Sequence, residues 1–136
     1  MSLLKKRVVM VAVALSLTLS MSYPCYVAEY NFSDQKKFVD SNNWTYIGSA
    51  TKDSTTSYGE LKITQMYNTD DTINYAFSQV YAKATSSGTS ILVTKGSWQT
   101  VPIPSSYQSA GKSVALYCMG HNPSLDCKIS GFWNVH

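Results

Sequence analysis

From residue 44 onward, short stretches rich in β-branched and aromatic residues are separated by polar turn clusters, without a long helical pattern. β-branched and aromatic residues favour the pleated, half-buried surface of a sheet, and clusters such as 68–71 and 86–88 are typical of turns. About seven short strands with such connections predict an all-β fold, an antiparallel β-sandwich or a small barrel. The strands are expected at 44–47, 61–67, 73–82, 89–94, 98–103, 113–120 and 128–135.

Four local patterns add detail to this prediction. Residues 61–67 alternate with period two and predict a half-exposed strand. Residues 73–82 also alternate, and the aromatic residues on one face favour a strand over a helix. Pro102 has no N–H to donate to a ladder, so its strand is expected at a sheet edge. Ser33 to Asp40 fits a short helix with Ser33 as N-cap and with Phe38 and Val39 facing inward.

Residues 1–28 have the pattern of a secretory signal peptide, followed by one domain at 29–136. Lys5, Lys6 and Arg7 precede the charge-free stretch 8–23, as a basic region precedes an apolar one in such signals. The apolar part is shorter than the about 20 residues of a bilayer-spanning helix, so no stable membrane anchor is expected. Cleavage is expected after Ser22 or Ala28, and the sequence therefore predicts a secreted, extracellular protein.

The charge balance argues against nucleic acid as a partner. The net charge of +3 equals the contribution of Lys5, Lys6 and Arg7, so residues 29–136 are neutral and contain no arginine. Binding to phosphate backbones depends on neutralising many charges. A neutral domain with scattered lysines is therefore expected not to bind nucleic acid.

Cys118 and Cys127 are predicted to form a disulfide, because two strands joined by a turn at 119–126 would bring the sulfurs close. Such a bond persists outside the cytoplasm, and closing about ten residues stabilises a fold by about 2.5–3 kcal/mol. Cleavage after Ala28 would remove Cys25 and leave this even pair. Zinc held by these cysteines with His121 and His136 is the alternative. Their spacing fits no finger pattern, so no metal site is expected.

No set of residues predicts catalysis, and the protein is expected not to be an enzyme and to need no cofactor. His121, Ser124 and Asp126 share one loop, but adjacency in sequence is not the geometry of a catalytic triad. Asp70, Asp71 and Glu60 are the remaining acidic candidates. Two adjacent aspartates after Asn68 and Thr69 are more typical of a turn than of a paired-carboxylate or calcium site.

The aromatic residues offer a candidate binding surface. Trp44, Trp98 and Trp133, together with many tyrosines, would stack on sugars or peptides if they gathered on one exposed face. The alternative is that most of them belong to the core, since each aromatic side chain buries about 150–250 Å². The sequence leaves this choice open.

Several short patches resemble a family of small, uncharacterised secreted proteins of Gram-positive bacteria. They are Asn42-Asn43-Trp44, the apolar stretch 114–117, Asn122 in a polar loop, and the ending Ile129-Ser130-Gly131-Phe132-Trp133. The cysteine pair departs from that family's pattern. The resemblance implies an exported β protein that is sometimes associated with bacteriocin-type loci, and it implies no catalytic residue.

Two functional hypotheses follow. The first is a secreted, non-enzymatic protein that binds a cell-surface component, either a cell-wall or envelope constituent or another protein. Its support is the export signal, the neutral charge and the abundance of aromatic residues. The alternative is a secreted bacteriocin-like or toxin-like antimicrobial protein, suggested by small size, the expected disulfide and the family resemblance. The sequence leaves the oligomeric state open.

Overall fold

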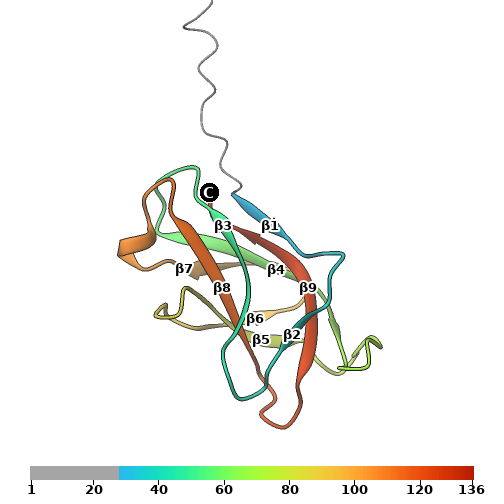
Figure 1. Ribbon diagram of the computed structural model, residues 1–136. Coiled ribbons are helices and arrows are strands. Elements are labelled where there is room, and N and C mark those ends of the chain that lie inside the picture. Colours follow the sequence, from blue (N-terminus) through green and yellow to red (C-terminus); the bar gives the residue numbers. More distant parts are fainter. Residues whose placement is uncertain (1–27) are drawn as a thin grey trace, which may run out of the picture.

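The computed structural model describes residues 28–136, which form two antiparallel β-sheets packed as a sandwich (Figure 1). The predicted all-β fold is confirmed, and of the two predicted architectures, a sandwich and a small barrel, the structure has the sandwich. Residues 1–27 of the expected signal peptide lie outside the described residues, and only its last residue, Ala28, is described. Within residues 28–136, the chain forms no helix of the length and apolar character needed to cross a membrane.

The five-stranded sheet has the order β1-β9-β4-β7, with β2 pairing with β9 as well. Its strands are β1 (Glu29–Asn31), β2 (Lys37–Val39), β4 (Tyr58–Tyr67), β7 (Trp98–Pro102) and β9 (Cys127–Asn134). The four-stranded sheet has the order β3-β8-β5-β6. Its strands are β3 (Thr45–Thr51), β5 (Gln79–Ala84), β6 (Ile91–Thr94) and β8 (Ser113–Gly120). A 3-10 turn spans Ser105–Tyr107.

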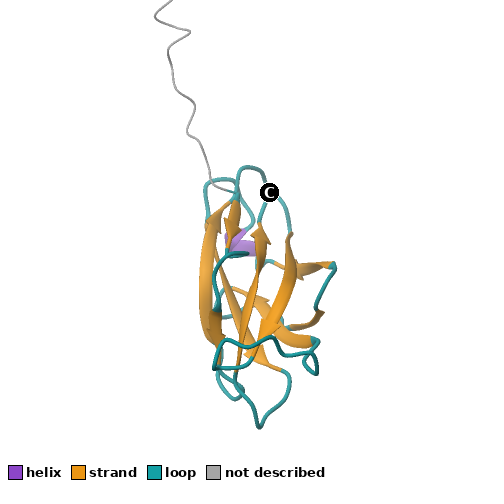
Figure 2. Cartoon of the chain, turned by 90° about the vertical axis from the view of Figure 1, so that its right-hand side faces the viewer, coloured by secondary structure: helices purple, strands orange, loops and turns teal. Residues whose placement is uncertain are grey.

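Loops gather at the two ends of the sandwich, with the strands running between them (Figure 2). The loop 121–126 joins β8 of the four-stranded sheet to β9 of the five-stranded sheet, and it lies at the lower end of Figure 1. The two sheets are tied together near this loop, because the Gly120 N–H donates to the Asp40 carbonyl at 2.9 Å. The Ser41 N–H also donates to Asp126 Oδ1 at 2.8 Å.

The core is formed by alternate residues of both sheets, as expected when each sheet buries one face. In β8, for example, Val114, Leu116 and Cys118 are buried, whereas the residues between them are half-buried. Trp133 of β9 is fully buried, and its indole N–H donates to the Val114 carbonyl of the opposite sheet at 3.1 Å. This hydrogen bond links the two layers through the largest side chain of the core.

Six of the seven longer strands fall at or near their expected positions, and the strand expected at 73–82 overlaps β5 only at 79–82. The sequence missed the two three-residue strands β1 and β2. Pro102 lies on β7, which pairs only with β4 at the sheet edge, so the expected edge position is confirmed. The expected helix at Ser33 to Asp40 is wrong. A turn precedes β2, in which Val39 pairs with Cys127 and Phe38 is exposed.

Two irregularities interrupt the expected alternation. In β4, the register shifts between Ile63 and Gln65, so that Leu61, Ile63 and Met66 are the buried residues. The strand expected at 73–82 begins only at Gln79. The Asn74 side chain holds the residues that precede β5 in a turn, because its Oδ1 accepts the N–H groups of residues 76 and 77 at 2.9 and 3.0 Å. Residues 76–78 lie beside the 121–126 loop.

Candidate functional site

The outer surface of the four-stranded sheet carries a group of aromatic side chains, here called the aromatic face: Trp44, Tyr46, Tyr81 and Tyr117. Alternation explains their common direction. Tyr81 and Tyr117 each lie between two buried neighbours of their strands, so their side chains point away from the core. The register places Tyr46 directly opposite Tyr117.

Contacts between neighbouring strands hold the aromatic face together. The Tyr46 and Tyr117 rings meet edge to face with centroids 5.8 Å apart. Lys83 pairs with Tyr117 across the β5–β8 ladder, and its ammonium lies 4.4 Å from the centre of the Trp44 ring. Tyr46 remains 55% exposed. The Tyr46 and Tyr117 rings therefore fix one another, and the Tyr46 ring remains accessible to a ligand.

The two sheets differ in charge. The four strands beneath the aromatic face contain a single charged residue, Lys83. The five strands of the opposite sheet contain the charged residues Glu29, Lys37, Glu60, Lys62 and Lys128. Aromatic rings and hydroxyl groups without carboxylates suit an uncharged ligand better than a polycation or a polyanion.

The structure does not bring the three tryptophans onto one surface. Trp44 lies on the aromatic face. Trp98 lies on the outer side of the other sheet, where its ring packs against Phe132 with centroids 6.1 Å apart and the residue is 46% exposed. Trp133 belongs to the core. Each tryptophan therefore reports on a different layer of the molecule.

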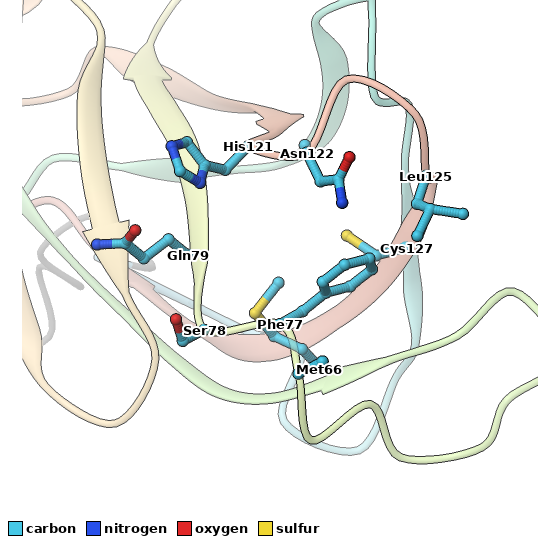
Figure 3. Close-up of a pocket in the computed structure, with 10 residues that line it drawn as sticks. Met66, Phe77, Ser78, Gln79, His121, Asn122, Leu125 and Cys127 are labelled. Atoms are coloured by element: carbon cyan, nitrogen blue, oxygen red, sulfur yellow. The ribbon is translucent and has the colours of Figure 1, made fainter.

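A pocket of about 260 Å³ opens between the 68–78 loop and the 121–126 loop (Figure 3). His121 and Ser78 lie on one side of it, and Phe77, Leu125 and Cys127 lie on the other. The residues that line this pocket belong to the described part of the chain, and none of them is an aspartate, glutamate, lysine or arginine.

The pocket adjoins the aromatic face. His121 lines the pocket and also packs edge to face against Tyr81, with ring centroids 5.4 Å apart. No family model, curated protein or solved structure matches this chain. The candidate site is therefore defined by its geometry, as an aromatic surface with one charged residue, Lys83, that ends in a small pocket.

The cysteines that were expected to form a disulfide are free thiols in the structure, and both are buried. β8 and β9 do not form a hairpin. Cys118 faces inward from the four-stranded sheet and Cys127 from the five-stranded sheet. Burial raises the pKa of the Cys118 thiol, and Cys127 raises it further. Burial, with a smaller contribution from Asp126, raises the pKa of Cys127 to about 11.

These raised pKa values predict slow alkylation of the folded, reduced protein. Relative to the ordinary value of 9.0, a pKa of about 11 lowers the thiolate fraction of Cys127 about 100-fold at pH 8. Iodoacetamide labelling followed by peptide mass spectrometry should show both thiols protected in buffer and modified in guanidinium. Rapid labelling of Cys118 in the folded protein would contradict the burial on which this prediction depends.

The same shifts fix the direction of a pH effect. A thiol whose folded pKa exceeds its unfolded value stabilises the fold fully below pH 9, and this contribution is lost as the pH rises toward 11. The reduced protein should therefore lose stability above pH 9 more steeply than a Cys118→Ala, Cys127→Ala variant. Parallel pH profiles of the two proteins in urea denaturation would contradict this.

The other chemical candidates take part in local structure. Asp126 accepts the Ser41 N–H, and Asp71 pairs with Lys128 at 2.8 Å. Asp70 Oδ1 accepts the N–H and hydroxyl of Thr72 at 3.1 and 2.6 Å. Hydrogen bonds from Thr72 lower the pKa of Asp70, and the hydrogen bond from Lys128 lowers that of Asp71.

The four residues considered for zinc are not gathered at one point. His136 contacts Glu60 at 3.0 Å, whereas His121 packs on Tyr81. Within residues 28–136, no group of three or more histidine, cysteine, aspartate or glutamate side chains is placed to hold a metal ion.

The sequence did not single out Tyr46, Tyr81 and Tyr117 as site residues. A signal was present, because Tyr81 and Tyr117 both stand between small or aliphatic residues in strand patterns. Alternation alone does not say which face of a strand is outward or which strands are neighbours. That information comes from the pairing of β3, β8 and β5.

Proposed function

We propose that this protein is a secreted, non-enzymatic binding protein whose aromatic face holds an uncharged polysaccharide of the cell envelope. The observation that carries the proposal is the mutual contact of Tyr46 and Tyr117 on a sheet whose strands contain one charged residue. Tyrosine and tryptophan combine a large apolar ring with a polar group. They can therefore stack on a sugar ring and donate hydrogen bonds to its hydroxyl groups.

The geometry favours an extended ligand over a small, deeply enclosed one. The aromatic side chains come from three adjacent strands, β3, β8 and β5, so the contact surface runs across the sheet. Lys83 contacts the Trp44 ring and is thus partly engaged by the protein itself. A neutral glycan chain laid across these strands would contact several rings without requiring a charged partner.

Adsorption of the protein to purified cell walls tests this function. The wild type is compared with two variants, each of which replaces one exposed tyrosine by alanine. Tyr46→Ala removes a ring from the aromatic face, and Tyr58→Ala removes a 40% exposed ring from the five-stranded sheet. We expect Tyr46→Ala to weaken binding about tenfold, since truncating a central aromatic contact often costs more than about 1 kcal/mol. Tyr58→Ala should bind like the wild type.

Three outcomes would count against the proposal. They are no adsorption of the folded wild type, equal losses in the two variants, or binding to lipid vesicles in place of cell walls. The antimicrobial alternative stays a prediction and is tested by growth inhibition with the same proteins. Export also stays a prediction.

A further inference from the structure

The pocket beside the aromatic face presents a hydrogen-bond donor. The Asn122 side-chain oxygen accepts the Ser124 N–H at 3.0 Å, which assigns the oxygen and nitrogen of the amide. The amide nitrogen consequently points into the pocket, as Figure 3 shows. A ligand atom that meets it must be an acceptor, such as a carbonyl oxygen.

Apolar groups lie around the same donor. The thioether end of Met66, the ring of Phe77 and the thiol of Cys127 all point into the pocket (Figure 3). Burial raises the pKa of Cys127 to about 11, so this thiol is uncharged at neutral pH. These groups form a surface that fits a methyl group.

Size and charge restrict the ligand further. The pocket has a volume of about 260 Å³, whereas pockets that bind drug-sized ligands have volumes of about 300–1,000 Å³. No lining side chain is a carboxylate, ammonium or guanidinium, so a phosphate or an acidic sugar would find only the imidazole of His121 as an ionisable partner in the pocket. The pocket therefore fits one uncharged unit that combines a methyl group with a carbonyl acceptor.

We propose that the pocket binds the acetamido group of a terminal N-acetylhexosamine, with its carbonyl oxygen on Asn122 Nδ2 and its methyl group against Met66 and Phe77. This inference rests on the proposed function. His121 touches both the pocket and Tyr81, so a glycan on the aromatic face can reach the pocket with its last unit. The protein then recognises the end of an N-acetylated chain.

The test uses Asn122→Asp, which keeps the oxygen that accepts the Ser124 N–H and replaces the donor by an acceptor. A matched control exists in Asn31 at the end of β1, whose Oδ1 accepts the N–H of Ser33, two residues later, at 2.9 Å. Calorimetric titration with N,N′,N″-triacetylchitotriose and with cellotriose, which lacks acetamido groups, compares the full-chain wild type, Asn122→Asp and Asn31→Asp.

We expect the wild type to bind triacetylchitotriose at least tenfold more tightly than cellotriose. Asn122→Asp should abolish this preference, and Asn31→Asp should keep it. Equal binding of both sugars by the wild type, unchanged in Asn122→Asp, would overturn the acetamido site and leave the aromatic face as the binding surface. Binding of neither trisaccharide, with cell-wall adsorption retained, would also overturn it. Loss of cell-wall adsorption itself would instead count against the proposed function.

Discussion

Trp133→Ala is expected to lower the free energy of unfolding by about 3–5 kcal/mol, the usual cost of deleting a large buried aromatic side chain. Trp133 is fully buried, and its indole N–H donates to the Val114 carbonyl across the sandwich. The substitution therefore leaves a cavity and also removes a hydrogen bond between the two sheets. Since small domains are stable by about 5–15 kcal/mol, much of the total stability would be lost.

Guanidinium denaturation of three variants checks this prediction. Trp133→Phe keeps most of the apolar volume and removes the donor, so it should cost about 0.5–1.5 kcal/mol through the lost hydrogen bond. Trp98→Ala, at an exposed position on β7, should cost less than about 1 kcal/mol. If Trp133→Ala and Trp98→Ala destabilised the protein equally, the indole would not join the two sheets as described.

Lys52→Met is expected to lower the free energy of unfolding by about 2–4 kcal/mol, because it removes a buried donor with several acceptors. The Lys52 side chain is fully buried after β3. Its ammonium donates to the Val135 and His136 carbonyls at 2.9 and 2.8 Å and to the Thr56 hydroxyl. Methionine preserves the apolar stem, so the loss reports on these hydrogen bonds.

The pKa of Lys52 limits the size of this effect. Burial lowers the pKa, with Asp53 acting in the opposite direction, so part of the hydrogen-bond energy offsets desolvation of the ammonium. Lys112→Met, at an exposed position, is the control and should change stability by less than about 0.5 kcal/mol. Denaturation midpoints that agree for the two variants would show that Lys52 does not anchor the segment after β9.

The strands could be predicted from the sequence because alternation and turn residues are local signals. Pro102 is an example, since the missing N–H of proline requires an edge whatever the rest of the fold does. The short helix expected at Ser33 to Asp40 does not form, because residues 37–39 pair with β9 instead, as Val39 does with Cys127. The local preference for a helix is weak compared with the stabilisation that these residues gain by pairing with a strand about ninety residues further along the chain.

The site could be predicted only in its chemistry. The sequence left open whether the aromatic residues form a surface or the core. The structure places Trp133 in the core and Trp98 on the opposite sheet. Which strands lie side by side depends on pairing between distant segments, and this pairing is what brings Tyr46 to Tyr117. The pocket likewise depends on two loops, 68–78 and 121–126, whose proximity has no signature in the sequence.

The most direct test of the aromatic face is to follow the three tryptophan indole N–H signals by NMR while a soluble cell-wall glycan fragment is added. Trp44 reports on the aromatic face, Trp98 on the opposite sheet and Trp133 on the core. Binding as proposed predicts that the Trp44 signal shifts saturably while those of Trp98 and Trp133 stay in place. A saturable shift of Trp98 with Trp44 unmoved would contradict the assignment of the binding surface.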